Sequence, residues 1–258
     1  MRKMLGFILK LFGINTLYLK SKLGLDSFYI DLEKLKKQKG SDTTFQFGEI
    51  HPVLSERYND AGTMSGQYFH QDLYVAHRIF VNNPNRHVDI GSRIDGFVAH
   101  VAVFRPIEVL DIRKQNSKVK NISFKQADLM QLPSDMIDYS DSISSLHAIE
   151  HFGLGRYADP IDYWGHIKGI QNITEILKKG GRFYFSVPIG SQRIEFNAHR
   201  IFSIKYLLDI LKDSFEVAGF SYVDDNGDFY ENITLSEKSI DSNFNCNQGC
   251  GIFELIKK

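Results

Sequence analysis

Two histidines and a glutamate lie close together in the stretch LHAIEH, as His147, Glu150 and His151. A further histidine, His199, occurs in SQRIEFNAHR. Imidazole and carboxylate groups exchange protons near neutral pH, so such side chains can deprotonate a weakly acidic hydroxyl. We therefore take His151, Glu150 and His199 as the candidate catalytic residues, with His151 as the leading base.

The same stretch, HAIEH, also matches H-x-x-E-H, the inverted zinc-protease signature. That signature requires an α-helix, because only there do histidines four residues apart share a face and bind one zinc ion. The preceding DSISSL is serine-rich with a β-branched isoleucine, and it offers no helix cap. We therefore expect a strand that ends at His147 and no metal site, and a zinc metallohydrolase stays the less favoured alternative.

A second group of residues suits a nucleotide. In HVDIGSRIDG, residues 87–96, a short apolar strand from His87 to Ile90 runs into Gly91, which leaves no Cβ between the backbone and a ligand. The helix that follows presents unpaired N–H groups to a polar or anionic ligand. A second apolar strand, in IEVLDIR, ends in Asp111, where an acid can bind both hydroxyls of a ribose.

A third apolar segment, NISFKQADL, ends in Asp128. A lone aspartate in such a position is commonly a helix cap. Asp89, Asp111 and Asp128 recur, however, near the ends of three successive strands, and this spacing favours a ligand-binding edge. From His87 onward strands alternate with helices, which predicts an α/β fold with a Rossmann-like, doubly wound sheet covered by helices on both faces.

With these residues the chain resembles the class I S-adenosylmethionine-dependent methyltransferases. Asp89 and Gly91 match that family's first motif, acid-x-Gly-x-Gly-x-Gly, and Asp111 matches its ribose acid. Arg93 and Asp95 stand where the family usually has its second and third glycines, which implies a wider or differently shaped turn. A dinucleotide-binding oxidoreductase would need G-x-G-x-x-G, a glycine triplet that this sequence lacks.

The resemblance implies S-adenosylmethionine as the cofactor. It implies that Asp128 binds the adenine amino group, with Leu129 supplying the backbone, and that the tip of the fourth strand faces the transferred methyl group. Arg93 could reach the methionine carboxylate. The resemblance also implies a mostly parallel sheet with an antiparallel last strand, GIFELIKK against FEVAGFSYVDD. The expected cofactor-binding residues are Asp89, Gly91, Ser92, Arg93, Asp111, Ile112, Asp128, Leu129 and His147.

The loop FGLGRYADPIDYWGHIKGI, together with HVDIGSRIDGF, resembles a methyltransferase-like family called domain of unknown function 268, which often occurs beside surface-polysaccharide genes. A polar loop of this kind suits a hydroxyl-rich acceptor, and Trp164 could stack on a sugar face. The expected function is O-methylation of a sugar or other hydroxylated small molecule in surface-polysaccharide biosynthesis. A non-catalytic module that binds the cofactor or a saccharide remains the alternative, and Arg93 and Asp95 favour it.

The sequence divides into an N-terminal helical extension, residues 1–80, and a methyltransferase domain, residues 81–258. Near the end of the extension, Tyr68, Phe69 and His70 are candidates for a lid over the cofactor site. The alternative is that these three aromatic side chains only pack against the helix that follows them.

Helical spacing makes two further predictions. The first is a helix over Asp72–Phe80 whose packed face contains Leu73, Ala76, His77 and Phe80. The second is a helix over Gly165–Lys178 that ends in KKGG, with Gly180 as the C-cap glycine.

With 258 residues, 43% of them hydrophobic, the chain can bury a full core. Its formal net charge is zero, whereas general nucleic acid binders carry a basic excess, so we expect no nucleic acid partner. The expected partner is a small-molecule or saccharide acceptor, and the sequence predicts no oligomeric state. Cys246 and Cys250 are too few for a disulfide framework and are expected to be reduced surface thiols.

Residues 1–20 combine apolar residues at helical spacing with lysines and an arginine. Such a segment can lie on an anionic membrane surface, or pack as an amphipathic helix against its own domain or a partner subunit. No small-residue cleavage site of a signal peptide follows it, and no apolar stretch reaches the ~20 residues that a membrane span requires. The expected location is cytoplasmic, with peripheral contact to the inner face of the membrane as an open alternative.

Overall fold

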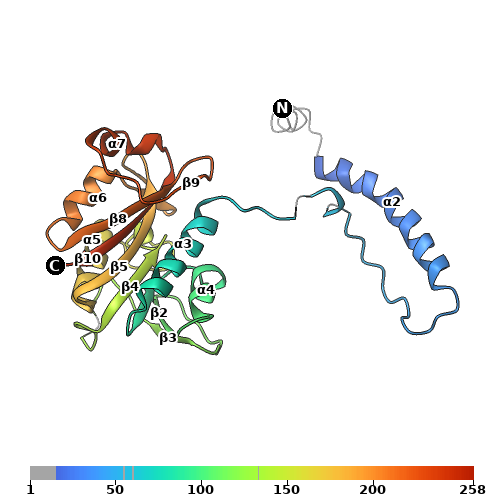
Figure 1. Ribbon diagram of the computed structural model, residues 1–258, viewed down its shortest axis with the longest axis horizontal. Coiled ribbons are helices and arrows are strands. Elements are labelled where there is room, and N and C mark those ends of the chain that lie inside the picture. The colour runs from blue at the N-terminus through green and yellow to red at the C-terminus, as the bar shows by residue number, and fades with distance from the viewer. Residues whose placement is uncertain (1–15, 55, 60, 133) are drawn as a thin grey trace. The chain divides into compact units, whose positions relative to one another are not determined.

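The computed structural model describes residues 16–54, 56–59, 61–132 and 134–258. It separates the chain into two compact units, Met1–Thr63 and Met64–Lys258 (Figure 1). Most of the amphipathic segment 1–20 lies outside the described residues, so its contact with a membrane stays a prediction. Within the described residues, no helix combines the length and the apolar character that crossing a membrane requires.

The first unit contains α2 (Thr16–Lys39) and a 3-10 turn, Glu56–Tyr58. The helices of the second unit are α3 (Gln67–Asn82), α4 (Ala99–Ala102), α5 (Gly165–Ile176), α6 (Ile204–Leu211) and α7 (Glu237–Asp241). Its strands are β1 (His87–Ile90), β2 (Ile107–Asp111), β3 (Ile122–Gln126), β4 (Ser140–Leu146), β5 (Leu177–Ile189), β6 (Arg193–Glu195), β7 (His199–Ile201), β8 (Phe215–Val223), β9 (Phe229–Tyr230) and β10 (Gly249–Lys257). Short helical turns lie at Ile94–Val98, Ile149–His151 and Asn243–Asn245.

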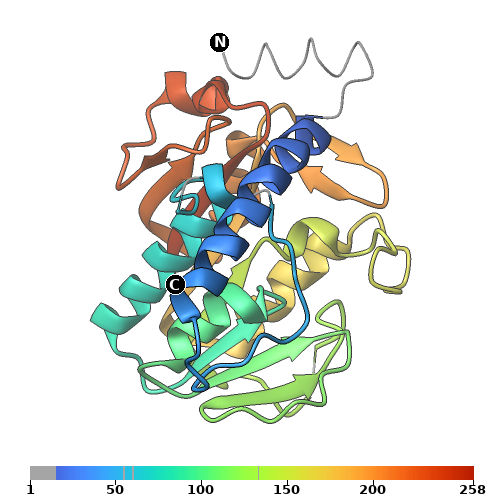
Figure 2. The same cartoon turned by 90° about the vertical axis from the view of Figure 1, so that its right-hand side faces the viewer.

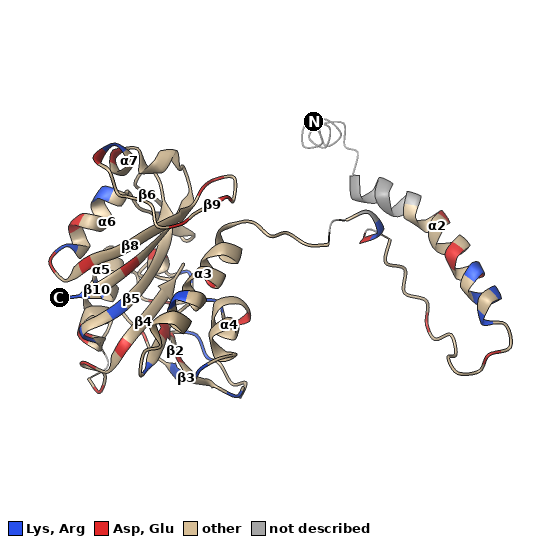
Figure 3. Ribbon diagram, in the orientation of Figure 1, with Lys and Arg blue, Asp and Glu red and all other residues tan. Residues whose placement is uncertain are grey.

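Helix α2 confirms the predicted helical character of the N-terminal extension. Its last turn carries Lys36, Lys37 and Lys39, whose positive charges are favourable near the negative end of the helix dipole (Figure 3). These lysines therefore stabilise α2. In the second unit, charged residues of both signs are spread along the helices and strands (Figure 3).

The main sheet has the strand order β3-β2-β1-β4-β5-β10-β8-β9. The first five strands are parallel, and β10 runs antiparallel to both of its neighbours, β5 and β8. Val88 in the central strand β1 pairs with Glu108 of β2 on one side and with Ile143 of β4 on the other. The predicted Rossmann-like sheet with an antiparallel last strand is confirmed.

Helices cover both faces of this sheet, and the strands supply alternate side chains to the two layers. Phe183 and Phe185 of β5 belong to the apolar layer that contains the buried isoleucines of α5 and the buried face of α6. Tyr184, between them, belongs to the other layer, with Val75 and Ile79 of α3 and with α4. Figures 1 and 2 show α3 and α4 together on that second face. The alternation places the core in two layers, one on each side of the sheet.

Helix α3 corrects two expectations. It begins at Gln67, earlier than predicted, and it belongs to the second compact unit, although the sequence analysis assigned it to the extension. The face that packs on the sheet is centred on Val75 and Ile79, whereas His77 and Phe80 are exposed. The predicted packed face was wrong except at Ala76, because helical spacing is also met by Val75 and Ile79, and the helix is rotated so that these two face the sheet.

The junction between α5 and β5 also differs from the prediction. The helix ends at Ile176, and Leu177 is already extended and pairs with Ser140 of β4. The next paired residues are Ser142 and Arg182, so the intervening residues form an irregularity in the strand. Gly180 has a φ of 73° within this irregularity. Gly180 therefore allows a left-handed backbone inside β5. It does not cap α5, although the stretch KKGG predicted that it would.

The two cysteines are unpaired, and both are buried. The prediction of surface thiols was wrong, because Cys246 packs in the apolar layer of α5 and α6, and Cys250 packs in the opposite layer beside α3. Cys250 lies in β10 between Pro188 of β5 and Val223 of β8. Burial raises the pKa of the Cys246 thiol to about 12.

Candidate active site

The carboxyl ends of β1, β2 and β4 meet at one edge of the sheet, where the strand order changes direction. A cavity of about 560 Å³ lies at this edge, a size typical of ligand-binding clefts. A smaller cavity of about 50 Å³ adjoins it. Predicted cofactor-binding and catalytic residues meet here, since both cavities are lined by Gly91, Asp111, Arg113, His147, His151 and Tyr157.

Gly91 follows β1 with a φ of 70°, in the left-handed region that favours glycine. Its N–H donates to the carbonyl oxygen of Leu110 at 3.0 Å. A Cβ at this position would lie 3.0 Å from the Cβ of Ala148, closer than side-chain carbons normally approach. The turn therefore has no room for a side chain and fits a ligand that approaches the backbone closely.

Asp89 holds this turn from behind. Its buried carboxylate accepts hydrogen bonds from the N–H and Oγ of Ser92, at 3.0 and 2.5 Å, and from Oγ of Ser144 at 2.6 Å. Burial raises the pKa of Asp89 to about 6, against the effect of these hydrogen bonds. Among the described residues that line the cavities, Ser92 is present and Asp89 is not. Asp89 thus contributes to the site through the turn.

The unusual turn expected at Arg93 and Asp95 is a π-helical turn, Ile94–Val98. The guanidinium of Arg93 donates to both carboxylate oxygens of Asp95 at 3.3 Å and lies 4.9 Å from the ring centroid of Tyr68. Arg93, Asp95 and Tyr68 all line the larger cavity. A carboxylate ligand at Arg93 would therefore share it with Asp95.

Asp111 ends β2, as predicted, and is held by a residue that the sequence analysis did not single out. Nε of Arg113 donates to Oδ1 of Asp111 at 2.9 Å, and the terminal amine donates to Oδ2 at 2.6 Å. The backbone N–H of Arg113 donates to Oδ1 as well, at 2.8 Å. The Arg113 guanidinium also lies 4.4 Å from the ring centroid of Tyr157. A ribose at Asp111 must therefore compete with this fork or displace it.

Asp128 follows β3, and its Oδ1 accepts a hydrogen bond from the N–H of Met130 at 2.9 Å. This local contact is the kind that an aspartate makes in a turn or helix cap. Asp128 also lines the smaller cavity, together with Ile112, Leu129 and Met130. The apolar side chains suit a flat aromatic ring such as a purine. Both interpretations of Asp128, a turn residue and a ligand-binding residue, are compatible with this position.

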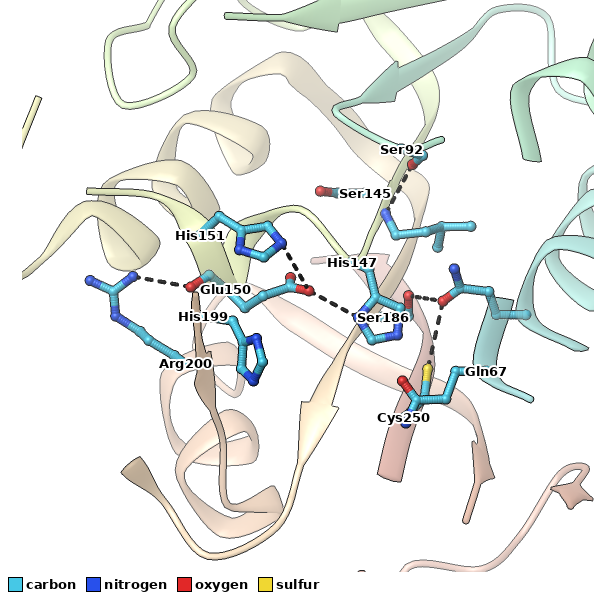
Figure 4. A network of polar contacts seen from close by, with 12 residues as sticks. Gln67, Ser92, Ser145, His147, Glu150, His151, Ser186, His199, Arg200 and Cys250 are labelled. Carbon is cyan, nitrogen blue, oxygen red and sulfur yellow. Dashed lines mark hydrogen bonds and ion pairs between the residues drawn. The ribbon is translucent and has the colours of Figure 1, made fainter. Parts of the chain in front are cut away.

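The predicted catalytic cluster is compact. His147 follows β4 directly, and its Nδ1 lies 2.9 Å from Oε1 of Glu150. Nε2 of His151 lies 3.7 Å from the same oxygen, so the carboxylate stands between the two rings (Figure 4). All three side chains are buried. Nε2 of His147 and Oε2 of Glu150 are buried atoms that have no hydrogen-bond partner among the described residues.

The two histidines differ in their tendency to bind a proton. Burial alone would lower the pKa of His147, but Cys250 and Glu150 outweigh it and raise this pKa well above the usual 6.5. Burial lowers the pKa of His151 below 6.5, against the effect of Glu150, and the positive charge of Arg156 lowers it further. His147 therefore forms an ion pair with Glu150, while His151 is neutral near pH 7.

The neutral form of His151 has a defined tautomer. Its Nδ1 lies 2.6 Å from the carbonyl oxygen of Ala198. Because a carbonyl oxygen only accepts, Nδ1 carries the proton and Nε2 has a free lone pair. The ring also meets the ring of Tyr157 edge-on, at a centroid distance of 5.4 Å. His151 is thus oriented as a base whose accepting atom is Nε2.

His199 lies in β7 and also lines the larger cavity. Its ring centroid is 6.4 Å from that of His151. Nε2 of His199 lies 3.2 Å from Oε2 of Glu195 and 3.1 Å from Nε2 of Gln248. His199 is therefore close to the cluster, but its Nε2 already has partners. Gln248, which no local motif in the sequence marks, lines the cavity beside it.

Arg200, next to His199, positions the catalytic turn. It is 4% exposed, and its guanidinium donates to the carbonyl oxygens of Glu150, Phe152, Asp162 and Tyr163 at 3.4, 2.6, 3.4 and 3.0 Å. Among the described residues, no carboxylate forms an ion pair with it. Figure 4 shows the guanidinium reaching the backbone of Glu150. Arg200 therefore joins the turn that bears Glu150 to the loop that follows it.

The loop after His151 is ordered by its own aspartate. Asp159 accepts hydrogen bonds from the N–H groups of Gly153, Gly155 and Tyr157 at 2.8, 3.1 and 3.0 Å. This arrangement presents Tyr157 and its neighbour Arg156 to the larger cavity. Trp164, which the sequence suggested as a stacking residue, is exposed and is not among the described lining residues.

The three lid candidates separate in the structure. Tyr68 lines the larger cavity, and its ring lies 5.1 Å from that of His147. His70 stacks on Phe229 at 5.4 Å, and Phe69 packs edge-on against His70. All three belong to the first turn of α3. Tyr68 alone of the three borders the site, together with Gln67.

The stretch HAIEH does not form the α-helix that a zinc signature needs. His147 follows a strand, and Ile149–His151 is a single 3-10 turn, in agreement with the expected strand end. Among the described residues, no group of three or more histidine, cysteine or acidic side chains is placed to hold a metal ion.

The cavity residues fit S-adenosylmethionine. The Gly91 turn gives close access to the backbone, Asp111 offers carboxylate oxygens, and Leu129 borders an apolar recess. Arg93 and Asp95, which line the larger cavity, offer charged groups of both signs. The two adjoining cavities can therefore hold a nucleoside and a polar amino-acid group.

Solved structures share this fold. The chain is similar to the [4+2]-cyclase SpnF, with a TM-score of 0.51 and 15% identity over 73% of this chain and 80% of that chain. It is also similar to the 1,6-didemethyltoxoflavin-N1-methyltransferase of Burkholderia thailandensis, solved with 1,6-didemethyltoxoflavin and S-adenosylhomocysteine. That match has a TM-score of 0.50 and 12% identity over 73% of this chain and 78% of that chain. No curated protein matches the sequence significantly.

A family model matches residues 98–250, more than half of the chain. Its description is "Caenorhabditis protein of unknown function, DUF268". The matched region includes the catalytic cluster, the loop with Arg156 and the hairpin with His199. The resemblance drawn from the loop sequence is confirmed: the chain belongs to the DUF268 family and has the fold of the class I S-adenosylmethionine-dependent methyltransferases.

Proposed function

We propose that the protein is an S-adenosylmethionine-dependent methyltransferase that acts on an oxygen of a sugar or another hydroxylated small molecule. One observation carries the proposal. His151, with an unprotonated Nε2, lines the same cavity as the Gly91 turn and Asp111. A proton acceptor thus adjoins a cradle suited to a nucleoside.

Residues at the ends of β1, β2 and β3 would hold the cofactor. Gly91 admits close contact with the backbone, Asp111 binds ribose hydroxyls, and Leu129 packs against adenine. When bound, S-adenosylmethionine supplies an electrophilic methyl group on a sulfonium that is a good leaving group. The protein then has to align the acceptor and remove its proton.

His151 removes the proton from the acceptor hydroxyl. Burial lowers its pKa, so the ring is neutral and able to accept near pH 7. The hydrogen bond to Ala198 fixes the tautomer and the direction of the ring. Once Nε2 is protonated, Oε1 of Glu150, 3.7 Å away, stabilises the positive charge. Glu150 is therefore the electrostatic partner of the base.

The acceptor side of the cavity supports a hydroxylated substrate. Gln67 and Gln248 contribute amide groups that can bind hydroxyls, and the rings of Tyr68 and Tyr157 can contact the apolar faces of a sugar. Because the DUF268 resemblance links such chains to surface-polysaccharide genes, we extend the proposal to a cytoplasmic step in the synthesis of those polysaccharides.

Incubation with methyl-labelled S-adenosylmethionine and a small-molecule extract tests this function. Label should pass to a hydroxylated product and should be lost with His151→Ala. The matched control is His77→Ala, which removes an exposed imidazole that is not among the described lining residues. Transfer to nitrogen would overturn O-methylation, and transfer that survives His151→Ala would overturn the role of the base.

A module that binds the cofactor or a saccharide without transferring methyl groups is the second candidate. Its support is the Arg113 fork, which takes both oxygens of Asp111. SpnF, named as a [4+2]-cyclase, is an example of this fold with another stated activity. Cofactor binding with no label transfer to any component of the extract would favour this candidate.

A further inference from the structure

Arg156 is an exposed cation beside the candidate base, and it has no acidic partner among the described residues. The other arginines that line the larger cavity, Arg93 and Arg113, each pair with an aspartate. In the part of the chain that the structure describes, no carboxylate lies within ion-pair distance of Arg156. Its recorded contacts are a backbone carbonyl and an aromatic ring, neither of which carries a compensating charge.

The geometry ties Arg156 to His151. A terminal amine of Arg156 donates to the carbonyl oxygen of Ala198 at 3.0 Å, and the same oxygen accepts from Nδ1 of His151 at 2.6 Å. The guanidinium lies 5.3 Å from the ring centroid of Tyr157, whose ring meets His151 edge-on. One carbonyl and one ring thus hold the cation and the base side by side.

This placement has an electrostatic cost for a base. The charged and titratable groups around His151 are Glu150, His147, Arg156, Tyr157 and His199. The positive charge of Arg156 disfavours a proton on His151, which opposes the step that the base must perform. A negative group held at Arg156 would cancel that charge when the acceptor binds. The remaining N–H groups of the guanidinium could then pair with its oxygens.

We propose that Arg156 is the anion-binding residue of the acceptor site, and that the acceptor carries a carboxylate or phosphate group beside the hydroxyl that His151 deprotonates. This inference rests on the proposed function. It narrows the substrate class to acidic sugars and sugar phosphates, or to similarly charged hydroxylated molecules. Gln248 and Gln67 line the same cavity, and their amide oxygens can accept hydrogen bonds from uncharged hydroxyls.

The test uses the full chain with saturating S-adenosylhomocysteine and two minimal probes, inorganic phosphate and acetate, at constant ionic strength. NMR follows the ring proton of His151 while each anion is added. Both anions should bind in the millimolar range, and the tighter one identifies the group that the acceptor carries. Anion binding should also raise the pKa of His151, because it neutralises Arg156.

Arg156→Gln should weaken anion binding at least about tenfold, whereas Arg156→Lys should keep most of it, since the charge is retained. The matched control is Arg86→Gln. Arg86 lies before β1, and it too donates to a backbone carbonyl and stacks on a tyrosine, Tyr139, at 3.3 and 4.1 Å. Its loss should leave the titration unchanged.

Two results would overturn the inference: neither anion perturbs His151 in the wild type, or Arg156→Gln binds phosphate and acetate as the wild type does. A purely structural role for Arg156 predicts the second result together with lower thermal stability. The affinity for S-adenosylhomocysteine is measured in a separate titration. A protein that does not bind it would count against the proposed function. The anion titration can then be repeated without S-adenosylhomocysteine. That titration tests anion binding at Arg156 independently of cofactor binding.

Discussion

The carbonyl oxygen of Ala198 accepts a hydrogen bond from Nδ1 of His151 at 2.6 Å. Ala198 immediately precedes β7, whereas His151 follows β4, so two separate segments set one tautomer. The contact leaves Nε2 of His151 as the atom that can accept a proton, 3.7 Å from the carboxylate of Glu150. The candidate catalytic chemistry depends on this relationship.

His151→Ala should reduce the rate of single-turnover methyl transfer by about 10²–10⁴, the usual contribution of a general base. His199→Ala should change it by less than about tenfold, because Nε2 of His199 is already engaged by Glu195 and Gln248. The measurement uses saturating cofactor and the acceptor found by label transfer. If His199→Ala proves the more damaging change, the role of base passes to His199.

The pH dependence of the wild-type rate provides an independent check on His151. A base must be deprotonated to act, so the rate falls as pH drops through its pKa. Burial puts the pKa of His151 in the free protein below the usual 6.5. Because kcat/KM reports the free protein, kcat/KM for the acceptor should stay level from pH 7 upward and decline only in more acidic solution. A decline that begins above pH 7 would contradict this assignment.

Arg200→Met should lower the free energy of unfolding by about 2–4 kcal/mol, because it leaves carbonyl groups of the catalytic turn without a buried donor. Arg200→Lys should be more stable than Arg200→Met, but its rate of methyl transfer should stay below that of the wild type, since one ammonium cannot reproduce the guanidinium fork. Urea unfolding gives the stability. If Arg200 positions the catalytic turn, Arg200→Lys should also change the pH profile of the rate. If its role is only structural, the pH profile should stay the same.

His87 makes folding sensitive to acid. Burial lowers its folded-state pKa from 6.5 to about 3, so the unfolded chain binds the proton more readily between these values. Stability from His87 is thus fully present above pH 6.5 and is lost as pH falls toward 3. At pH 4 the loss is on the order of 3 kcal/mol. His87→Gln should show a shallower decline between pH 6.5 and 4, and parallel curves would refute the assignment.

Residues 1–63 should be dispensable for cofactor binding. All described residues that line the two cavities belong to the second compact unit, Met64–Lys258. A chain that begins at Met64 should therefore bind S-adenosylhomocysteine within about threefold of the full chain, a difference of less than 1 kcal/mol. Calorimetry on both chains gives the comparison. A truncated chain that folds but does not bind would assign part of the site to the first unit.

The sequence predicted the sheet and the edge that holds the site because strand ends carry local signals. Asp111 lies at the end of an apolar strand and His147 directly follows a serine-rich one, and both line the cavity. Gly91 was identified by the same reasoning, since only a glycine tolerates its turn.

Residues whose roles depend on distant partners were not predicted. Arg200 acts on carbonyl groups that lie 37–50 positions earlier in the chain, and no local pattern encodes such contacts. Gln248 reaches the cavity from the segment before β10, next to His199. Cys250 looked exposed because its neighbours are polar, yet its side chain is buried in the layer beside α3. Tertiary packing decides these positions.

The most direct test of the account is calorimetric titration of S-adenosylhomocysteine into the wild type, Asp111→Ala and Arg113→Gln. The wild type should bind one equivalent in the micromolar range, and Asp111→Ala should bind at least about tenfold more weakly, because it loses a doubly bonded carboxylate contact. Arg113→Gln should bind no more weakly than the wild type, since it removes the guanidinium from both oxygens of Asp111 and leaves only the backbone N–H on Oδ1. Absence of binding by the folded wild type, or equal binding by Asp111→Ala, would contradict the account.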